Sequence, residues 1–320
     1  MTTIEELPLE ERSAPVTSAP EPRRRRGQSL PYGLLVPATL ALALALGYPL
    51  VRQVVLSFQD FGLAQQFGQP PEWVGLANYS DLLTDSYLWK VVLRSVAFCL
   101  VNAGLTALVG LAVALLMTRM SKVVRITVQV GLLLAWAMPV VASMTVWEFL
   151  FDTQYGIINW LLTHLGLDFD GHAWLLHPMS FFGVATVIVV WMSVPFVAFT
   201  MYAALTQVAE ELIESAEIDG ATAGQRFRYV VLPTIRPVLY VVLLLQIIWD
   251  LRVFTQIYNL QRAGGVTEQT NLLGTFIYRQ GVGGGHFGLA AAAAMFMLAL
   301  AIVMTAPYVR LMLKQEKEAA

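Results

Sequence analysis

Six long apolar segments limit what this sequence can fold into. Each has about 20 residues or more, and a helix of that length matches the thickness of the hydrocarbon core of a bilayer. Because lipid offers no hydrogen-bond partners, a segment that crosses it must satisfy its own backbone as a helix. The sequence therefore predicts an all-α, polytopic membrane protein with six transmembrane helices. The expected spans are Tyr32–Val51, Leu93–Met117, Ile126–Leu150, Phe181–Leu205, Val238–Leu260 and Phe287–Leu311.

The composition also favours a membrane protein over a soluble enzyme. Of the 320 residues, 57% are hydrophobic and 13% are charged. The single cysteine, Cys99, excludes an internal disulfide. The sequence has no Walker A phosphate loop, no G-x-S-x-G elbow and no H-E-x-x-H helix. We therefore expect no catalytic residue and no cofactor in this chain.

The first 28 residues differ from the rest. They are polar, rich in Pro, Ser and Glu, and end in Arg23–Arg26, so we expect a disordered cytoplasmic tail. An arginine run just before an apolar segment is interpreted as a topology signal rather than a nucleic-acid patch. Tyr32–Val51 is too long for a signal-peptide core, so it is expected to remain as the first span. The predicted domains are the tail 1–28, a membrane domain 29–314 and a short cytoplasmic tail 315–320.

The basic residues are unevenly distributed between the two sides. The loop 151–180 contains no Lys or Arg. The positive-inside rule therefore places both termini and the loop 210–237 in the cytoplasm. The basic residues of the expected inner side, besides the N-terminal arginines, are Arg119, Lys122, Arg125, Arg226, Arg228, Arg236, Arg310, Lys314 and Lys317, against Arg52, Lys90, Arg94, Arg262 and Arg279 on the outer side.

The loop 210–237 carries charge of both signs between two spans. Apolar residues at helical spacing predict a short helix, and Gly220 is expected to end it because glycine adopts the left-handed C-cap conformation easily. Thr222 or Asp219 would cap a second short helix, and Leu232-Pro233 with Pro237 would stiffen the return to the membrane. The residues alone leave open whether this helix–glycine–helix hairpin is merely solvated or contacts a partner.

The spacing in this loop resembles the EAA loop of ABC importer permeases. That motif is E-A-A, three residues, G, nine residues, then I-x-L-P. Here Glu214-Ser215-Ala216, Gly220 and Val230-Val231-Leu232-Pro233 match it, with serine and valine replacing an alanine and the isoleucine. The core Ile218–Ala221 is similar to the MalF/UgpA-like carbohydrate branch of these binding-protein-dependent permeases.

Three further loops resemble elements of the same family. The segment 69–79 is similar to its FVGLxNY element, and 155–160 is similar to its GxxN element. The segment 263–270 resembles its GGP…T loop, with Val266 replacing the proline. The resemblance covers roughly residues 32–314.

The resemblance implies an ABC type I importer permease fold and an ATP-driven importer of a di- or oligosaccharide, such as a chitobiose- or cellobiose-like sugar. Its partners would be a second permease in a heterodimer, a cytoplasmic ABC ATPase that holds ATP and Mg, and an extracellular or lipid-anchored solute-binding protein. The chain would lie in a bacterial cell membrane and bind no nucleic acid. Coupling to the ATPase would rest on Glu214, Ala216, Asp219, Gly220, Ala221 and Phe227.

Polar residues at membrane depth are costly and often functional. In the fifth span an aromatic ring stands beside an acid and an amide, which suits a sugar. A polar contact that only fixes packing, such as an Asp250–Arg252 pair, is the alternative. The resemblance aligns this stretch with the family's sugar-lining segment and adds a second wall from the fourth span. The expected pathway residues are Val189, Ser193, Phe196, Gln246, Trp249, Asp250 and Val253.

A self-sufficient secondary carrier that uses an ion gradient is the main alternative function, with Asp250 as its ion-linked group. The absence of an evident inverted repeat argues against it. The spacing of His164, His172 and His177 fits no standard ligand pattern, so no metal site is expected.

Overall fold

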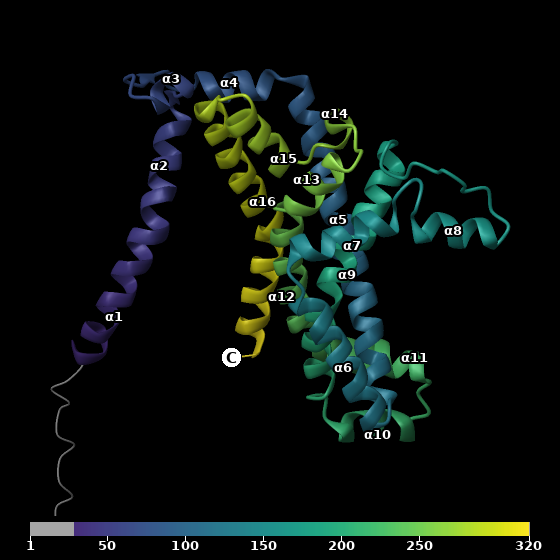
Figure 1. Ribbon diagram of the computed structural model, residues 1–320. Helices are drawn as coiled ribbons and strands as arrows, with labels where there is room; N and C mark the ends of the chain where they lie inside the picture. The colour runs from purple at the N-terminus through teal and green to yellow at the C-terminus, as the bar shows by residue number, and fades with distance from the viewer. Residues whose placement is uncertain (1–28, 320) are drawn as a thin grey trace, which may run out of the picture. The chain divides into compact units, whose positions relative to one another are not determined.

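The computed structural model describes residues 29–319, and the predicted tail 1–28 lies outside them (Figure 1). Within this range the chain is almost entirely helical, with one two-stranded antiparallel sheet in which β1 (Gln59–Asp60) pairs with β2 (Glu72–Trp73). The all-α prediction is confirmed. The chain divides into two compact units, residues 1–51 and 52–320.

The first unit contributes one long apolar helix. It contains α1 (Ser29–Leu42), a π-helical turn (Ala43–Gly47) and the beginning of α2 (Tyr48–Ser57). The apolar stretch Leu35–Ser57 has 23 residues, which is long enough to cross a bilayer. Its leucines are exposed, as expected for a helix that faces lipid.

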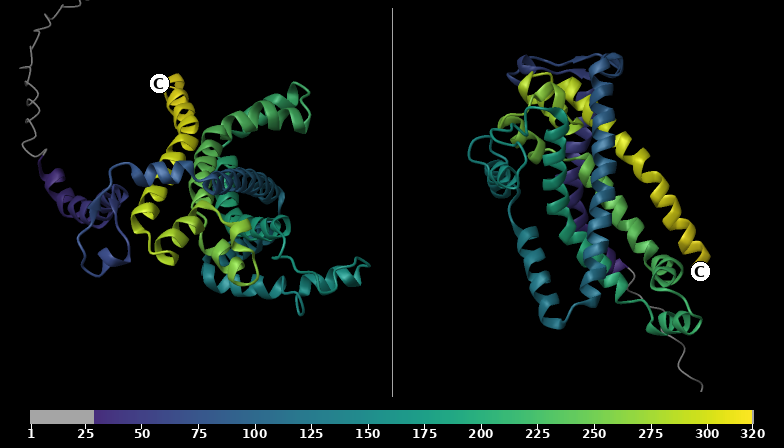
Figure 2. Two further views of the ribbon diagram at one scale, coloured as in Figure 1. Left: turned by 90° about the horizontal axis from the view of Figure 1, so that it is seen from above. Right: turned by 90° about the vertical axis from the view of Figure 1, so that its right-hand side faces the viewer.

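The second unit is built around four long helices (Figures 1 and 2). They are α5 (Ser86–Arg119), α9 (Pro178–Leu205), α12 (Leu232–Leu251) and α16 (Phe287–Ala319). The helix α5 packs along α9, and α12 packs against α5, α9 and α16. At Gly110 of α5 a Cβ atom would lie 2.5 Å from Val197 Cγ1 of α9, so glycine allows this close approach.

The third predicted span is bent rather than continuous. The helices α6 (Lys122–Ala137) and α7 (Val140–Leu150) meet at an angle of 100°. Pro139 has no N–H and disfavours helix at the residue before it, so α6 ends there. Pro139 then serves as the N-cap of α7. The span predicted over Ile126–Leu150 therefore consists of two helices that meet at this proline. Within residues 29–319 five helices can cross a membrane, or six if this bent pair counts as one.

The fifth predicted span also has different ends. The span predicted over Val238–Leu260 lies inside the 40-residue apolar stretch Ala223–Arg262, which can cross a membrane. The helix α12 stops at Leu251, and α13 (Thr255–Arg262) begins after a short break. At the N-terminal end of α12, the helix α11 (Ala223–Arg226) continues through a π-helical turn (Phe227–Val231) into α12 without a gap. The second helix of the hairpin is therefore not a separate short one. Pro233 lies inside this continuous helix, directly after the π-helical turn, which is where the backbone hydrogen bonds already depart from the regular α-helical pattern.

Short helices close the ends of the bundle. At the end where α5 begins lie α3 (Leu63–Gln66), α4 (Ala77–Thr84), α8 (Ile157–His164), α14 (Thr267–Thr270) and α15 (Leu273–Tyr278), and at the other end lies α10 (Glu210–Ile218) (Figure 1). Hydrogen bonds tie the segment from α14 to α15 to α5, since Leu273 N donates to Ser95 Oγ and Asn271 Nδ2 donates to the side-chain hydroxyl of Tyr87, both at 2.8 Å.

Candidate functional site

The charged hairpin α10–α11 projects from one end of the bundle (Figure 2). Gly220 has φ +79°, the left-handed conformation that favours glycine. Its N–H donates to the Glu217 carbonyl, and the next N–H, of Ala221, donates to the Ala216 carbonyl, both at 2.9 Å. This is the Schellman pattern that ends a helix at a glycine. The predicted helix–glycine–helix arrangement is confirmed.

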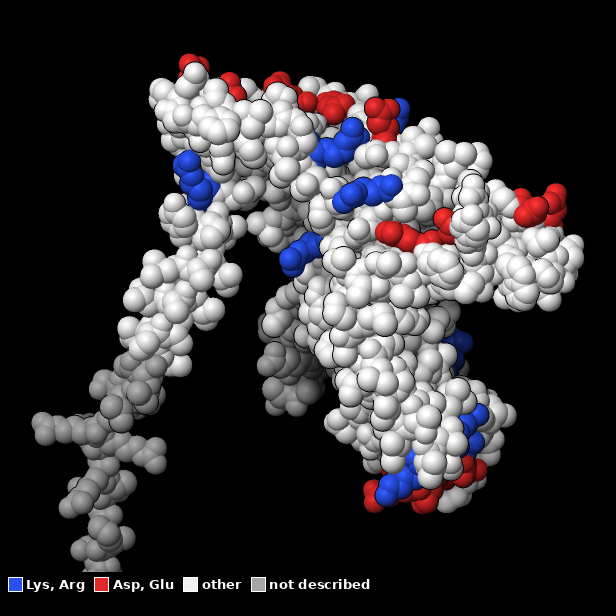
Figure 3. Space-filling view, viewed as in Figure 1, with Lys and Arg blue, Asp and Glu red and all other residues white. Residues whose placement is uncertain are grey.

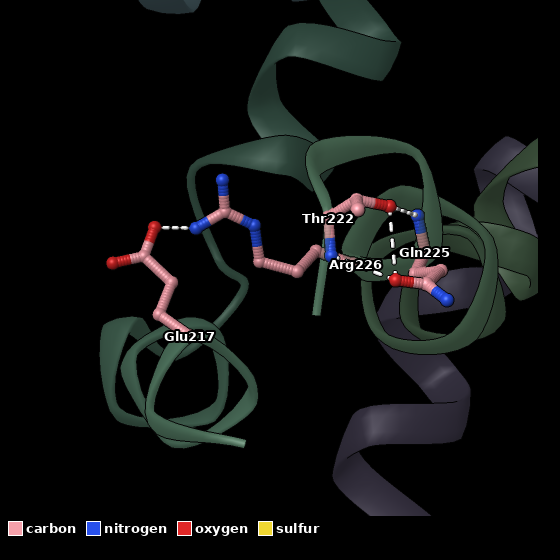
Figure 4. Close-up of polar contacts among 4 residues, drawn as sticks. All are labelled: Glu217, Thr222, Gln225 and Arg226. Carbon is pink, nitrogen blue, oxygen red and sulfur yellow. Dashed lines mark hydrogen bonds and ion pairs between the residues drawn. The ribbon is translucent and has the colours of Figure 1, made fainter. Parts of the chain in front are cut away.

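Thr222 caps the second helix of the hairpin. Thr222 N donates to Gln225 Oε1 at 2.8 Å, and Gln225 N donates to Thr222 Oγ1 at 3.4 Å (Figure 4). This reciprocal capping box satisfies two backbone donors at the start of α11. Asp219, the other expected cap, instead ends α10.

An ion pair crosses the glycine turn. Arg226 of α11 contacts the carboxylate of Glu217 of α10 (Figure 4). An exposed pair of this kind adds only about 0–1 kcal/mol to stability. It does link the two helices directly, and so it helps to set the angle between them. Sequence analysis missed this pair, because residues on two helices joined by a turn have no fixed spacing that reveals contact.

The predicted coupling residues divide between two sides of the hairpin. Glu214, Asp219 and Gly220 are exposed, whereas Ala216, Ala221 and Phe227 are half-buried. Ile218, which was not among the predicted residues, is 87% exposed. Ile218 thus adds an apolar side chain to the exposed, charged side of the hairpin.

A cavity of about 280 Å³ separates the hairpin from the bundle. Ile213, Phe227 and Val231 line it from the hairpin side, and Leu115 of α5 with Leu205 of α9 line it from the bundle side. The cavity thus lies between the hairpin and the ends of α5 and α9.

The predicted pathway residues form two groups. Phe196 of α9 and Trp249 of α12 meet edge to face, with ring centroids 5.0 Å apart, and Trp249 is 40% exposed. Ser193 is half-buried on α9 near this pair in sequence. The remaining residues, Val189, Gln246, Asp250 and Val253, are buried. The stripe expected to share one face is thus divided, and Val253 lies beyond the end of α12.

Gln246 and Asp250 lie on the part of α12 that packs against α5. Cys99 Sγ of α5 donates to the Ile247 carbonyl at 3.4 Å, which fixes the register of the two antiparallel helices. Within residues 29–319 Asp250 forms no ion pair, and Arg252 is exposed, so the Asp250–Arg252 contact considered above is absent. Gln246 Nε2 and Oε1 and Asp250 Oδ2 have no hydrogen-bond partner.

Two further buried polar residues lie on α5. Asn102 and Thr106 are fully buried, and Asn102 Oδ1 and Thr106 Oγ1 also have no partner, although Asn102 Nδ2 donates to Thr186 Oγ1 of α9 at 3.5 Å. A buried polar atom without a partner costs about 1–3 kcal/mol, so Gln246 and Asp250, on either side of Trp249 in α12, indicate a site that a polar ligand or water completes. Sequence analysis missed Asn102 and Thr106. Their spacing from Cys99, at three and seven residues, is the helical pattern that signals them.

Comparison with known proteins identifies the chain. A family model described as "Binding-protein-dependent transport system inner membrane component" matches residues 106–314. The chain belongs to this family. It is 43% identical over 295 residues to the "Diacetylchitobiose uptake system permease protein DasB" of Streptomyces coelicolor. The alignment covers 92% of this chain and 90% of that protein.

Two further relatives agree with this placement. The permease is 33% identical over 240 residues to the "Trehalose/maltose transport system permease protein MalF" of Thermococcus litoralis, with 74% of this chain and 79% of that protein covered. A solved bacterial ABC transporter involved in the import of alginate superposes with a TM-score of 0.73 at 25% identity, covering 89% of this chain and 96% of that one.

These findings confirm the predicted ABC type I importer permease fold and exclude the secondary carrier. The permease is a multi-pass inner-membrane subunit of an ABC importer. Subunits of this kind work with a second permease, an ATPase and a binding protein. The homologous proteins are permease subunits that have no ATPase site of their own.

Proposed function

We propose that this permease forms the translocation path of an ATP-driven, binding-protein-dependent importer of a di- or oligosaccharide. Relatives named for diacetylchitobiose and for trehalose and maltose support a sugar, and the higher identity to the former favours a chitobiose-like one. The second permease is a different chain, and the binding protein is extracellular or lipid-anchored. Both termini and the hairpin lie in the cytoplasm of a bacterium in this proposal, which the distribution of Lys and Arg supports.

The observation that best supports ATP-driven transport by this permease is the continuous helix from Ala223 to Leu251. It begins at the hairpin and ends two residues after Trp249, so it joins the proposed ATPase contact to the proposed sugar site without an interruption. A rigid helix moved at one end moves at the other, which is how closure of an ATPase pair would change access to the site.

The hairpin docks on the ATPase in this proposal. Glu214 offers an exposed carboxylate for an arginine of the ATPase, and Ile218 offers an apolar contact beside it. Ala216, Asp219, Gly220 and Ala221 set the shape of the turn. Phe227, at the cavity behind the hairpin, holds α11 to the bundle while allowing it to shift.

The sugar is bound where α9 and α12 meet. The half-exposed rings of Phe196 and Trp249 suit the apolar C–H faces of a pyranose. Ser193 lies close to them in sequence, and Val189 and Val253 support the wall from behind. The unpartnered atoms of Gln246 and Asp250 are available to sugar hydroxyls once the helices rearrange.

Reconstitution tests this function. The permease, with its partner permease and ATPase, is placed in liposomes, and uptake of labelled diacetylchitobiose is measured with the binding protein outside. We expect uptake that requires both internal ATP and the binding protein. Uptake that persists without ATP and collapses with the proton gradient would contradict the proposal. Uptake of cellobiose but not of diacetylchitobiose would change the proposed substrate to cellobiose.

A further inference from the structure

The helix α8 lies beside the bundle rather than within it. It projects sideways from the chain that follows α7, across the direction of the long helices (Figures 1 and 2). The motif at its start, Gly156 and Asn159 of the segment 155–160, takes no part in the hairpin or in the proposed sugar site. The contacts of these two residues show what the motif does.

Gly156 and Asn159 fix the position of α8. A Cβ atom at Gly156 would lie 2.2 Å from the Asp152 carbonyl oxygen, so glycine allows the tight turn between α7 and α8. Asn159 is buried, and its Nδ2 donates to the His172 carbonyl at 2.9 Å. Its Oδ1 accepts a hydrogen bond from Trp174 Nε1. The motif therefore holds one side of α8 against the loop that returns to α9.

A stripe of large apolar side chains follows the other side of α8. Trp160 is 60% exposed, and Leu165, directly after the helix, is 69% exposed. The stripe consists of Ile157, Trp160, Leu161 and Leu165. Steps of three and four residues place these side chains on one face of a helix, and Asn159 lies on the opposite face. The loop that Asn159 holds therefore leaves the stripe exposed.

The returning loop and the stripe face opposite ends of the molecule. Together α8 and this loop form a lobe, residues 157–177. In Figure 1 the loop passes above α8, on the side where α4 lies, so the stripe faces the end with the hairpin. Asp168 and Asp170 of the loop are exposed. Figure 3 shows acidic atoms on the upper edge of the lobe and an uncharged surface below. The lobe is thus polar above and apolar below.

The height of α8 matches the edge of a bilayer. Lys122 and Arg125 at the start of α6 mark one boundary of the hydrocarbon core, because cationic side chains avoid its interior. The 16 residues of α6 rise about 24 Å, close to the core thickness of about 30 Å. The chain then bends by 100° into α7, and α8 follows at a similar height in Figure 1. The helix α8 therefore lies near the second boundary.

We infer that α8 is an interfacial helix, with its apolar stripe inserted among the acyl chains of one leaflet and the loop above it facing water. Helices with one apolar side lie in the plane of the membrane surface in this way, and tryptophan is enriched at that depth. The stripe extends a surface that lipid already covers, since Leu134 and Trp136 of α6 are exposed. In the orientation proposed above, the leaflet is the outer one.

Charge and direction favour lipid over a soluble partner. A soluble protein that approaches the lobe from the water meets Asp168 and Asp170 on the loop, whereas the stripe faces the other way. Residues 151–180 contain no Lys or Arg, so α8 has no cation to bind an anionic headgroup. Insertion therefore rests on apolar contact with the acyl chains, and a bilayer of neutral lipid suffices for it.

Spin labels at two exposed positions of α8 test the inference. In a Cys99→Ala parent, Leu161→Cys places a nitroxide on the stripe, and the matched control Thr163→Cys places one on the same helix away from it. The assembled transporter, with partner subunits freed of accessible cysteines, is held in nanodiscs of dioleoylphosphatidylcholine. At position 161 collisions with oxygen should exceed those with a water-soluble nickel complex several-fold, because oxygen concentrates in lipid. At position 163 the nickel complex should dominate.

Two results would overturn the inference. Equal access of the nickel complex to both positions would mean that the stripe lies in water. Low collision rates with both reagents at position 161 would mean that protein covers the stripe, as the second permease would. The labels report on membrane insertion whether or not the transporter carries sugar, so a failure of the proposed function is seen separately, in the uptake assay.

Cross-linking identifies what covers the stripe. A photoreactive benzoylphenylalanine replaces Trp160 in the same assembled transporter, and illumination should yield a phospholipid adduct that mass spectrometry of the permease detects. The same group at position 163 should yield none. A cross-link from position 160 to the second permease or to the binding protein, in place of the lipid adduct, would contradict the inference.

Discussion

Gly220 is the residue whose chemistry most constrains the hairpin. Its left-handed conformation would cost any residue with a Cβ about 1–2 kcal/mol, yet nothing lies within 4 Å of the position where that Cβ would be. A substitution there therefore changes the turn and not the packing. This separates an effect on coupling from a general loss of fold.

Gly220→Val should abolish ATP-driven uptake while the permease still inserts and assembles. Gly220→Asn should keep most of the uptake, because asparagine tolerates the left-handed region better than other residues. Uptake by proteoliposomes, corrected for the amount of assembled transporter, checks both variants. Equal rates for valine and glycine would show that the turn does not matter.

A substitution of Gln246 tests the role of the buried polar residues of α12, Gln246 and Asp250. Gln246→Leu removes two buried atoms that have no partner, so we expect thermal stability in detergent to rise, by about 1–3 kcal/mol. Sugar uptake should nevertheless fall, because the amide is then missing from the proposed site. Unfolding temperature and the KM for uptake are measured on the same preparation.

Thr106→Val provides the comparison for this prediction. It also removes an unpartnered buried hydroxyl at nearly constant volume, from α5 and outside the proposed pathway residues. Stability should rise as well, with uptake retained. Retained uptake in both variants would assign the polar group to packing rather than to transport.

At the scale of elements, the ion pair between Glu217 and Arg226 sets how α10 lies against α11. Glu217→Arg should place two like charges across the turn and lower the uptake achieved per ATP hydrolysed. The reciprocal variant Glu217→Arg/Arg226→Glu should restore most of it. Little change in unfolding temperature is expected, since exposed pairs contribute little to stability.

The measurement is uptake and hydrolysis in the same liposomes. If Glu217 and Arg226 acted independently of each other, the double variant would not recover uptake, because the two losses would add. Additive losses would remove the pair from the mechanism.

The elements show what a sequence reveals and what it hides. Apolar length located the membrane helices, and Gly220 and Thr222 marked a real turn and a real cap, because these signals are local. The bend at Pro139 and the break after Leu251 were missed, since apolar length does not say whether a segment is straight. Asn102 and Thr106 were also missed, because the face of α5 that is buried depends on packing between helices far apart in sequence.

At the scale of the whole molecule, orientation is the main prediction. The segment 59–84 and the hairpin lie at opposite ends of α5, whose 34 residues span about 51 Å. With the buried Cys99 replaced by alanine, a membrane-impermeant maleimide should label a Phe67→Cys variant in intact cells. It should label an Ile218→Cys variant only in inside-out vesicles.

Both positions are more than four-fifths exposed, so access and not burial decides the labelling. Labelling of both variants from the same side, or the reverse of the expected sides, would contradict the proposed topology. The Cys99→Ala parent is the control, and it should remain unlabelled in both preparations.

The packing of residues 59–84 against Gly285 and Gly288 has a consequence for how the protein is made. This segment is synthesised early, whereas Gly285 directly precedes the final helix and Gly288 lies in its first turn. A ribosome must therefore complete nearly the whole chain before residues 59–84 reach their finished form. Truncated or stalled products would lack that form, so this surface of the permease forms only when synthesis is nearly finished.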